Sequence, residues 1–271
     1  MRRLLIRPGA IGDSIAAFPA LEHLAADYTE LWVPSAIVPL APFAQRVRPL
    51  ASTGIDLVGV GDLEMPGGLK AELESFDSIV SWYGANRPEF RQALLSLGVA
   101  CEFHTALPPV GHAGHATDYF ARQVGAALGG WPRIRMEQRS GPRDTIVIHP
   151  FSGGLRKNWP EERYRELASK LTCKVEWTAG PEDEWEDATR FTNLAELAGW
   201  IAGARLYIGN DSGIAHLAAA TGIATLALFG PSSPQTWAPR GPRVTVLVSD
   251  PLQRLSVETV VRTANRLLGF R

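Results

Sequence analysis

Short apolar runs alternate with amphipathic patterns along the whole of this 271-residue chain. In the first half, apolar runs predict strands at 2–7, 29–34, 56–60 and 78–84. Apolar residues at helical spacing predict helices at 14–25, 88–98 and 116–130. Pro19 should kink the first of these helices, because proline removes one backbone hydrogen bond.

The second half repeats this alternation. Apolar runs predict strands at 145–150, 173–180, 205–209, 224–230 and 244–249, and helical patterns lie at 160–171, 193–204, 212–222 and 256–270. Strands that alternate with helices are typical of βαβ units and parallel sheets. A polar stretch at 137–144 separates the two series. We therefore expect an α/β fold with a first domain over 1–142 and a second over 143–255, and ligands at the carboxyl ends of the strands.

Composition and charge exclude several classes of protein. The formal net charge is −1, with 27 Lys and Arg against 28 Asp and Glu, whereas a nucleic-acid binder usually has a basic excess. Cys101 and Cys173 lie far apart, which fits a reducing compartment and not a disulfide scaffold. No apolar run approaches the roughly 20 residues of a membrane span. We expect a cytoplasmic protein that binds no nucleic acid.

Four loops have the same design, in which a strand ends, small residues follow and a helix begins. These loops are 8–14, 149–160, 209–222 and 229–241. Three of the four lie in the second half, which therefore looks like the main ligand-binding half.

The loop 149–160 has the residues of a phosphate site. Ser152, Gly153 and Gly154 can present backbone N–H groups without obstruction, and Lys157 adds a positive charge before a helix begins. A plain turn with a solvated lysine is an equal alternative, because the loop is not a Walker motif.

The loop 209–222 has a similar design. Asp211 or Ser212 is suited to cap the helix that follows, whose N-terminal N–H groups would then face an anion. Asp211 itself would repel phosphate, so we expect it to cap the helix or to accept a hydrogen bond from a hydroxyl. His216 lies one turn into this helix, where a packed or capping role is the more usual one. His, Cys and carboxylates do not cluster at metal-ligand spacing in the sequence.

Asp13 is the most informative carboxylate of the first half. Its simplest role is to cap a helix over 14–26. A catalytic role requires it to face a cleft between the domains, as the carboxyl end of the first strand would allow.

Three stretches resemble glycosyltransferase family 9, the ADP-heptose:lipopolysaccharide heptosyltransferases. They are IRPGAIGDSIAAFPAL, HPFSGGLRKNWP and YIGNDSGIAHLAAATGIATLALFGPSSPQTWAPRG, in the family's order and at roughly its spacing. The resemblance extends weakly over most of the chain. It implies the GT-B fold, with two Rossmann-like domains facing a central cleft, and an inverting transfer with no essential metal. It also implies that the final helix, 256–271, packs back on the first domain.

The same resemblance assigns roles to single residues. It implies that Asp13 is the general base and that Lys157 holds the donor diphosphate. Either Glu182 or Glu184 would contact the donor ribose, and Arg87 fits a basic position on the acceptor side. The donor site would be lined by Asp211, Ser212, Gly213 and His216.

These observations combine into a functional hypothesis. The chain is expected to move a heptose-like sugar from an ADP-sugar to a hydroxyl of a lipopolysaccharide core or related glycan. The acceptor is expected to be a lipid-linked or other glycan, with transient contact at the inner membrane surface as a possible further feature. Chemistry supports this, since Asp13 offers a base and Lys157 with helix N-termini offers the positive field that a metal would otherwise supply. The alternatives are a nucleotide-sugar epimerase or hydrolase on this fold, or an inactive nucleotide-sugar-binding module.

The chain also departs from the family pattern. The segment 186–200 is shorter than usual, and Ser81, Trp82, Tyr83 and Gly84 replace the usual Asp-x-Gln-Gly motif. These departures concern the acceptor more than the chemistry.

Overall fold

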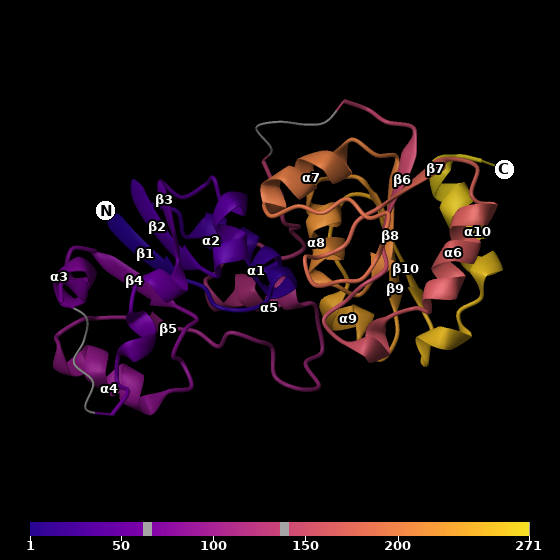
Figure 1. Cartoon of the computed structure of the whole chain (residues 1–271). Helices are drawn as coiled ribbons and strands as arrows, with labels where there is room; N and C mark the ends of the chain where they lie inside the picture. The colour runs from indigo at the N-terminus through magenta and orange to yellow at the C-terminus, as the bar shows by residue number, and fades with distance from the viewer. Residues whose placement is uncertain (62–66, 136–140, 271) are drawn as a thin grey trace. The chain divides into compact units, whose positions relative to one another are not determined.

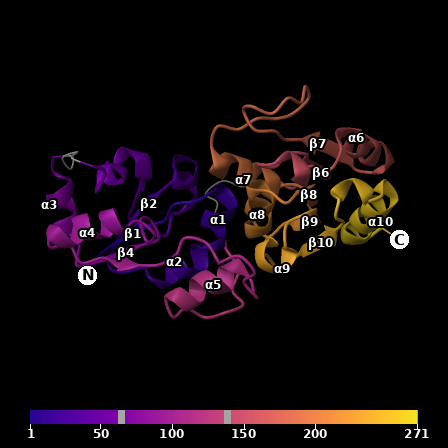
Figure 2. The same ribbon diagram turned by 90° about the horizontal axis from the view of Figure 1, so that it is seen from below.

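The computed structural model describes residues 1–61, 67–135 and 141–270, which form two compact units. The first unit consists of Met1–His112 and Ala116–Gly130, and the second of Ala113–His115 and Trp131–Arg271. Figures 1 and 2 show that each unit is a sheet with helices on both of its faces. Each is described separately below.

The first unit is built on a five-stranded parallel sheet in the order β3-β2-β1-β4-β5. Its strands are β1 (Arg2–Ile6), β2 (Tyr28–Val33), β3 (Arg46–Pro49), β4 (Ser78–Ser81) and β5 (Glu102–Phe103). Alternate residues of β1 point to opposite faces, so that Leu4 and Ile6 enter one apolar cluster while Leu5 is buried on the other face. This arrangement confirms the predicted parallel α/β architecture.

Helices cover both faces of this sheet. They are α1 (Ile11–Ala16), α2 (Phe18–His23), α3 (Leu69–Glu74), α4 (Pro88–Ser96) and α5 (Ala116–Gln123), with 3-10 turns at Ser35–Leu40, Leu50–Ser52 and Ile55–Leu57. α3 and α4 pack on the face of Leu4 and Ile6, while α1, α2 and α5 contact one another. The predicted kink at Pro19 is confirmed as a break, because α1 ends at Ala16 and Pro19 lies in the first turn of α2.

One predicted strand of the first unit is wrong. The stretch 56–60 forms a 3-10 turn and a bend, and β3 is the edge strand in its place. Gly54 and Gly59 both have positive φ angles, of 73° and 71°. A Cβ on Gly59 would lie 2.7 Å from the backbone oxygen of Glu89, so the chain turns where the apolar pattern alone predicted extension.

The second unit has a second five-stranded parallel sheet, in the order β10-β9-β8-β6-β7. Its strands are β6 (Thr145–His149), β7 (Lys174–Trp177), β8 (Leu206–Asn210), β9 (Ala224–Phe229) and β10 (Val244–Val248). The sequence predicts all five strands. The central strands β6, β8 and β9 are the clearest, because they are buried on both faces and are continuous apolar runs.

Five helices accompany this sheet. They are α6 (Glu161–Lys170), α7 (Leu194–Ala202), α8 (Gly213–Ala220), α9 (Pro234–Trp237) and α10 (Val257–Leu268), with 3-10 turns at Leu155–Lys157 and Leu252–Arg254. In both ribbon views α7 and α8 lie on one face of the sheet and α6 and α10 on the other (Figures 1 and 2).

Two features of the structure concern the division of the chain. α10 buries its apolar face, including Val260 and Ala264, in the core of the second unit against α6. The expected packing of the final helix on the first domain stays a prediction. The units divide at Gly130 and not at the expected position 142. The physical reason is that the chain is already tied to the second unit by then, because the Ile134 N–H donates to the Ala220 carbonyl at 3.1 Å.

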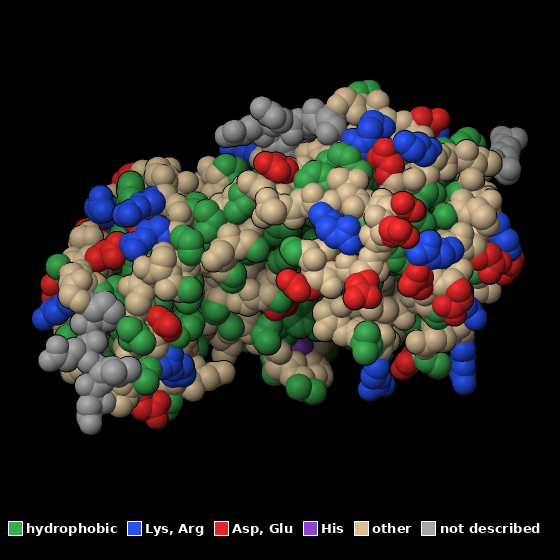
Figure 3. Space-filling model, viewed as in Figure 1, with side chains coloured by type: hydrophobic (Ala, Val, Ile, Leu, Met, Phe, Trp, Pro, Cys, Tyr) green, Lys and Arg blue, Asp and Glu red, His purple; other side chains and the backbone are tan. Residues whose placement is uncertain are grey.

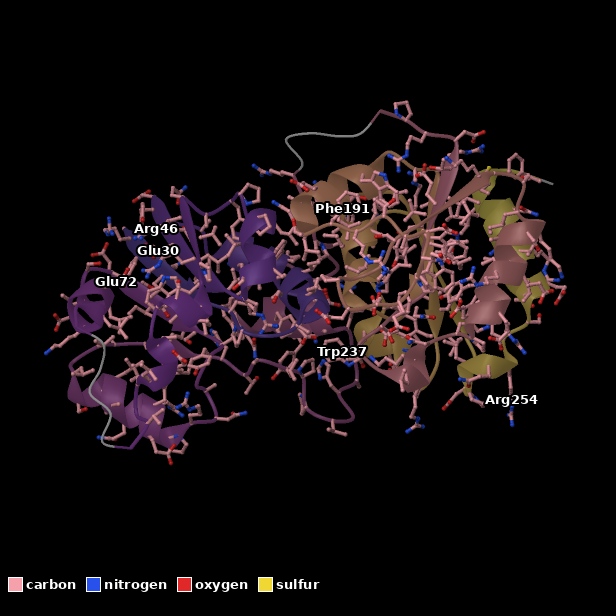
Figure 4. All side chains as sticks on the ribbon, viewed as in Figure 1. Glu30, Arg46, Glu72, Phe191, Trp237 and Arg254 are labelled. Carbon is pink, nitrogen blue, oxygen red and sulfur yellow. The ribbon has the colours of Figure 1, made fainter. Side chains whose placement is uncertain are left out.

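A buried carboxylate fixes the edge of the first sheet. Glu30 on β2 is 1% exposed and accepts a hydrogen bond from Trp32 Nε1 at 2.9 Å. Arg46 and Arg48 on the edge strand β3 lie 3.5 and 3.6 Å from its oxygens, and Arg48 also pairs with Glu72 of α3. Figure 4 shows Arg46, Glu30 and Glu72 gathered at this edge. The network lets a strand with two arginines occupy the position next to β2.

Surface charge is mixed. On the face shown in Figure 3, blue Lys and Arg side chains and red Asp and Glu side chains alternate over the second unit. Among the residues that the structure describes, no helix combines the length and the hydropathy needed to cross a bilayer.

The Glu30 network yields a prediction for stability. Glu30→Ala should lower the free energy of unfolding by about 3 kcal/mol, because removing one partner of a buried ion pair leaves the others uncompensated. Urea unfolding followed by tryptophan fluorescence measures this change. The control is Glu74→Ala, which removes a half-exposed i,i+4 partner of Lys70 and should cost roughly 0.5 kcal/mol or less. Equal losses in the two variants would contradict a structural role for Glu30.

Candidate active site

Three of the four chemistry-bearing loops meet at one edge of the second sheet. In the register of the parallel strands, His149 of β6 pairs with Gly209 of β8, and Asn210 of β8 pairs with Leu228 of β9. The loops that follow these strands therefore leave the sheet side by side at its carboxyl edge, as their shared design predicted.

Lys157 and Asp211 form an ion pair across two of these loops. Lys157 ends the short 3-10 turn of its loop, and its Nζ lies 2.8 Å from Oδ2 of Asp211. The Asp211 side chain is 7% exposed and the Lys157 side chain 41% exposed. The carboxylate thus obtains the partner that a buried charge requires, while the ammonium remains open to solvent. This contact holds the Lys157 side chain near the start of α8.

The start of α8 is capped by Ser212. Its side chain accepts a hydrogen bond from the Ala215 N–H, and Gly213 is the first helical residue. This resolves the alternative that the sequence left open, because Asp211 pairs with Lys157 and does not cap the helix. The N–H groups of the first turn of α8 and the Lys157 ammonium place hydrogen-bond donors at this edge, while the Asp211 carboxylate balances the charge of the lysine.

Ser152 organises the turn before Lys157. Its hydroxyl lies 2.7 Å from Asn158 Oδ1 and 3.0 Å from the Gly154 carbonyl. A Cβ placed on Gly153 or Gly154 would have no neighbour within 4 Å. The backbone of this turn is therefore open to a ligand, although nothing within the protein demands glycine at either position.

Asn210, a residue that sequence analysis did not identify, ties this turn to the sheet. Its side chain is fully buried and donates to the Pro150 carbonyl at 2.7 Å. Its Oδ1 accepts from the Trp159 N–H at 3.1 Å and from the Tyr164 hydroxyl at 2.7 Å. The one signal available in the sequence was an amide at the end of an otherwise apolar strand.

His216 lies inside this region and not on its surface. Burial lowers its pKa to about 4, the negative charge of Asp211 acts in the opposite direction, and the neighbouring His115 and Lys157 lower it further. His115 Nε2 lies 2.7 Å from the Ala238 carbonyl. His216 is therefore neutral at physiological pH, which fits the packed role that the sequence favoured.

The two glutamates proposed for ribose binding are exposed. Glu182 and Glu184 lie in the turn after β7, and Asp183 between them is the carboxylate that faces the sheet. Asp183 Oδ2 accepts from the Gly180 N–H at 2.8 Å, and its charge acts on the buried His149. The sequence had not singled out Asp183, because three acidic residues in succession gave no indication of which one turns inward.

Asp13 is at the third position of α1, and the helix begins before it. The N-cap is Ala10, which corrects the simplest sequence interpretation of Asp13 as the cap. Its Oδ2 accepts from the Ala10 N–H at 3.2 Å, while the carboxylate remains partly exposed. Gly9, with φ 124°, allows this approach, since its Cβ position lies 3.2 Å from the Asp13 Cβ.

A buried arginine supports the Asp13 turn. Arg7 is 0% exposed, and its guanidinium donates to the backbone carbonyl of Asp13 at 3.0 Å and to that of Ala106 at 2.9 Å. The guanidinium also lies 4.4 Å from the centre of the Phe120 ring. Burial lowers the pKa of Arg7 to about 10, and the negative charge of Asp13 opposes this shift, so Arg7 stays protonated at neutral pH. Sequence analysis placed Arg7 at the end of the first predicted strand and did not predict its contact with Asp13.

The Arg87 side chain contacts Tyr83 and Phe90 of its own unit. It is the N-cap residue of α4, its guanidinium donates to the Tyr83 hydroxyl at 2.8 Å, and it lies over the Phe90 ring at 5.6 Å. The contact with the Tyr83 hydroxyl thus ties the Arg87 guanidinium to its own unit. Among the described residues, no three His, Cys, Asp or Glu side chains are grouped so as to hold a metal ion.

Comparisons with known proteins bear on the family and the fold of this chain. A family model described as glycosyltransferase family 9 (heptosyltransferase) matches residues 123–263, more than half of the chain. Lipopolysaccharide heptosyltransferase 1 of Pseudomonas aeruginosa is 26% identical over an alignment that covers 86% of this chain and 80% of that protein.

Solved structures extend the comparison to the fold. Escherichia coli ADP-heptose lipopolysaccharide heptosyltransferase II has a TM-score of 0.74 at 19% identity, covering 99% of this chain and 98% of that one. E. coli heptosyltransferase WaaC, solved with ADP, has a TM-score of 0.69 at 18% identity, covering 98% of this chain and 100% of that one. These likenesses show the same two-unit fold and confirm the expected GT-B architecture.

The buried His216 yields a prediction for pH dependence. Because its folded pKa is about 4 and the ordinary value is 6.5, the unfolded state binds more protons between these values. Stability contributed by the neutral imidazole is therefore complete above pH 6.5 and is lost as the pH falls toward 4, by about 3 kcal/mol. His216→Gln should flatten the loss of stability over this pH range, measured by urea unfolding at each pH. The exposed His23→Gln should leave the wild-type slope, and an unchanged slope in His216→Gln would contradict the prediction.

Proposed function

Because this chain belongs to glycosyltransferase family 9, we propose that it moves a heptose-like sugar from ADP-heptose or a related ADP-sugar, with inversion, to a hydroxyl of a lipopolysaccharide core or similar glycan. Membership makes it a glycosyltransferase, and the donor, acceptor and stereochemistry are what the proposal adds. The observation that carries it is the Lys157–Asp211 pair beside the open turn of Ser152 to Gly154 at the start of α8.

The donor end of the proposal rests on the carboxyl edge of the second sheet. The diphosphate would lie against Lys157, the open turn and the first N–H groups of α8. These groups stabilise the negative charge that grows on the diphosphate as the bond to the sugar breaks. The relative named above acts on lipopolysaccharide, and WaaC was solved with ADP and with ADP-2-deoxy-2-fluoro heptose, which supports an adenine nucleotide donor here.

Asp13 is the proposed general base. Its carboxylate accepts one backbone N–H and is partly exposed, so the remaining lone pairs are free to receive the proton of the acceptor hydroxyl. In one displacement the acceptor oxygen bonds to the anomeric carbon, the diphosphate leaves with the bonding pair, and the hydroxyl proton passes to Asp13. Attack opposite to the leaving group inverts the configuration.

The proposal assigns no step to a divalent metal. Lys157 and the start of α8 already supply positive charge at the diphosphate, which is the electrostatic role a metal would have there. Glu182, Glu184 and Arg87 stay candidates for the ribose and the acceptor. We place the reaction in the cytoplasm, at the inner membrane surface that a lipid-linked acceptor would occupy.

The donor assignment predicts the effect of removing the lysine. Lys157→Ala should weaken ADP binding about ten- to a hundredfold, because a charge-assisted hydrogen bond to phosphate is lost. Isothermal titration calorimetry measures the affinity for ADP. Carrying out the titration in EDTA also tests whether the nucleotide binds without a divalent metal. Lys174→Ala, whose side chain is 76% exposed, should bind ADP like the wild type. Unchanged affinity in Lys157→Ala, or binding that appears only with added magnesium, would contradict the assignment.

The base assignment predicts a loss of rate without a loss of fold. Asp13→Asn keeps an oxygen for the Ala10 N–H, so the melting temperature and ADP affinity should stay near wild type, while kcat falls by about a hundred- to ten-thousandfold. Asp56→Asn, an exposed carboxylate of the same unit, is the matched control. Product analysis separates transfer from release of free sugar, which an epimerase or hydrolase would favour. A kcat within threefold of wild type would remove Asp13 from the mechanism.

A further inference from the structure

The hydroxyl of Tyr207 is a buried polar group in the second unit. Tyr207 lies on β8 and is 0% exposed, and among the residues that the structure describes its hydroxyl forms no hydrogen bond. A buried hydroxyl without a partner costs free energy, because it has lost its contacts with water and gained none within the protein. No step of the proposed reaction uses this group, and the direction of its side chain shows what it could serve.

The direction of the Tyr207 side chain follows from the alternation of residues along β8. Leu206 and Ile208 enter the apolar cluster that β8 forms with α6 and α10. Tyr207 therefore faces the opposite side, where α7 and α8 lie (Figures 1 and 2), and Gly209 faces this side as well. A Cβ placed on Gly209 would lie 2.4 Å from the Tyr207 hydroxyl oxygen. The hydroxyl thus extends along the strand toward its carboxyl end.

Glycine at position 209 leaves the space that this hydroxyl occupies. The same Cβ would lie 2.9 Å from the backbone oxygen of His149 on the neighbouring strand β6, so it would have contacts on two sides. Any larger residue at this position would displace the phenol from the edge of the sheet. Tyr207 and Gly209 are therefore matched to one another, and the pair directly precedes the loop that leads into α8.

Ser212 is the side chain that acts on the Tyr207 hydroxyl at this edge. Burial raises the pKa of Tyr207, and Ser212 acts to lower it, so the phenol is protonated at physiological pH and able to donate. The Ser212 oxygen caps α8 by accepting from the Ala215 N–H across a long distance of 3.4 Å. Because a hydroxyl oxygen has two lone pairs, this cap leaves room for a second donor.

We propose that Tyr207 is a positioning residue of the donor site and that it acts through Ser212. When an oxygen of the donor diphosphate lies at the start of α8, the Ser212 hydroxyl donates its hydrogen to that oxygen. The Ser212 oxygen then accepts from Tyr207, which fixes the serine in its donating orientation and strengthens its bond to the phosphate. Donor binding thus gives Tyr207 the partner that it lacks in the free protein. This inference rests on the proposed function, because it concerns the donor of the same reaction.

Replacement of the phenol should change stability and affinity differently. Tyr207→Phe should leave the melting temperature of the free protein unchanged or raise it, because a buried hydroxyl without a partner is removed. It should at the same time raise the Kd for ADP about fivefold, as expected for the loss of one neutral hydrogen bond. The stability control is Tyr164→Phe, which removes a buried hydroxyl that already donates to Asn210 at 2.7 Å and should lower the melting temperature.

A double-mutant cycle tests whether Tyr207 acts through Ser212. Ser212→Gly removes the serine hydroxyl and keeps most of the capping of α8. In this background Tyr207→Phe should not change the Kd for ADP any further, because the group that transmits its effect is absent. Isothermal titration calorimetry with ADP and with adenosine measures each variant. Adenosine has no phosphate and should bind equally to wild type and Tyr207→Phe, and Tyr28→Phe in the first unit should leave the Kd for ADP unchanged.

Four results would overturn the role of Tyr207. They are an unchanged Kd for ADP in Tyr207→Phe, an equal weakening of adenosine and ADP, additive losses in the double variant, and a fall in melting temperature as large as that of Tyr164→Phe. Failure of the proposed function would appear elsewhere, as unchanged ADP binding in Lys157→Ala. If Lys157→Ala weakens ADP binding and Tyr207→Phe does not, the diphosphate assignment is kept and only the role of Tyr207 is removed.

Discussion

The buried amide of Asn210 is the constraint on which the loop arrangement at the carboxyl edge of the second sheet depends. A side-chain amide with no access to water must find protein partners for its polar atoms. Asn210 finds them in the Pro150 carbonyl, the Trp159 N–H and the Tyr164 hydroxyl, which belong to a loop and a helix distant in sequence. The ends of the loop that carries Lys157 are thereby fixed to β8. Asp211, the next residue after Asn210, meets Lys157 as a consequence.

The two proposed chemical groups are supported by different physical means. In the second unit, charge is arranged by pairing, since Lys157 is kept in place by a buried carboxylate. In the first unit, the turn that bears Asp13 is supported through its backbone by Arg7, whose own charge is buried against an aromatic ring. The ion pair positions Lys157 and the Arg7 contact positions Asp13, each at the edge of its own sheet. Neither contact uses all of the hydrogen-bonding sites of the ammonium or the carboxylate. They leave the Lys157 ammonium and the Asp13 carboxylate open to a substrate.

The sequence predicted the central strands of both sheets and the positions of the candidate loops that follow them, because buried parallel strands are continuous apolar runs that end at small residues. It did not predict β3, since a strand of alternating arginines is stabilised by Glu30, a tertiary partner that local pattern does not reveal. The predicted strand at 56–60 is wrong, because glycines with positive φ angles turn the chain within and beside this apolar run. In the candidate site it identified Lys157 and Asp211 but not their contact, and it missed Asn210, Asp183 and Arg7, whose roles arise only from contacts between elements.

The short segment Ala113–His115 limits how this chain can be divided into folded fragments. It belongs to the second unit although the residues on both sides of it belong to the first, so the chain passes from one unit to the other three times. His115, on this segment, lies within hydrogen-bond distance of the Ala238 carbonyl and acts electrostatically on His216 of α8. A recombinant fragment that begins at the polar stretch before β6 would lack this piece and the Ile134 contact with Ala220 as well. The second unit is therefore discontinuous in sequence, and it cannot be excised intact with a single cut.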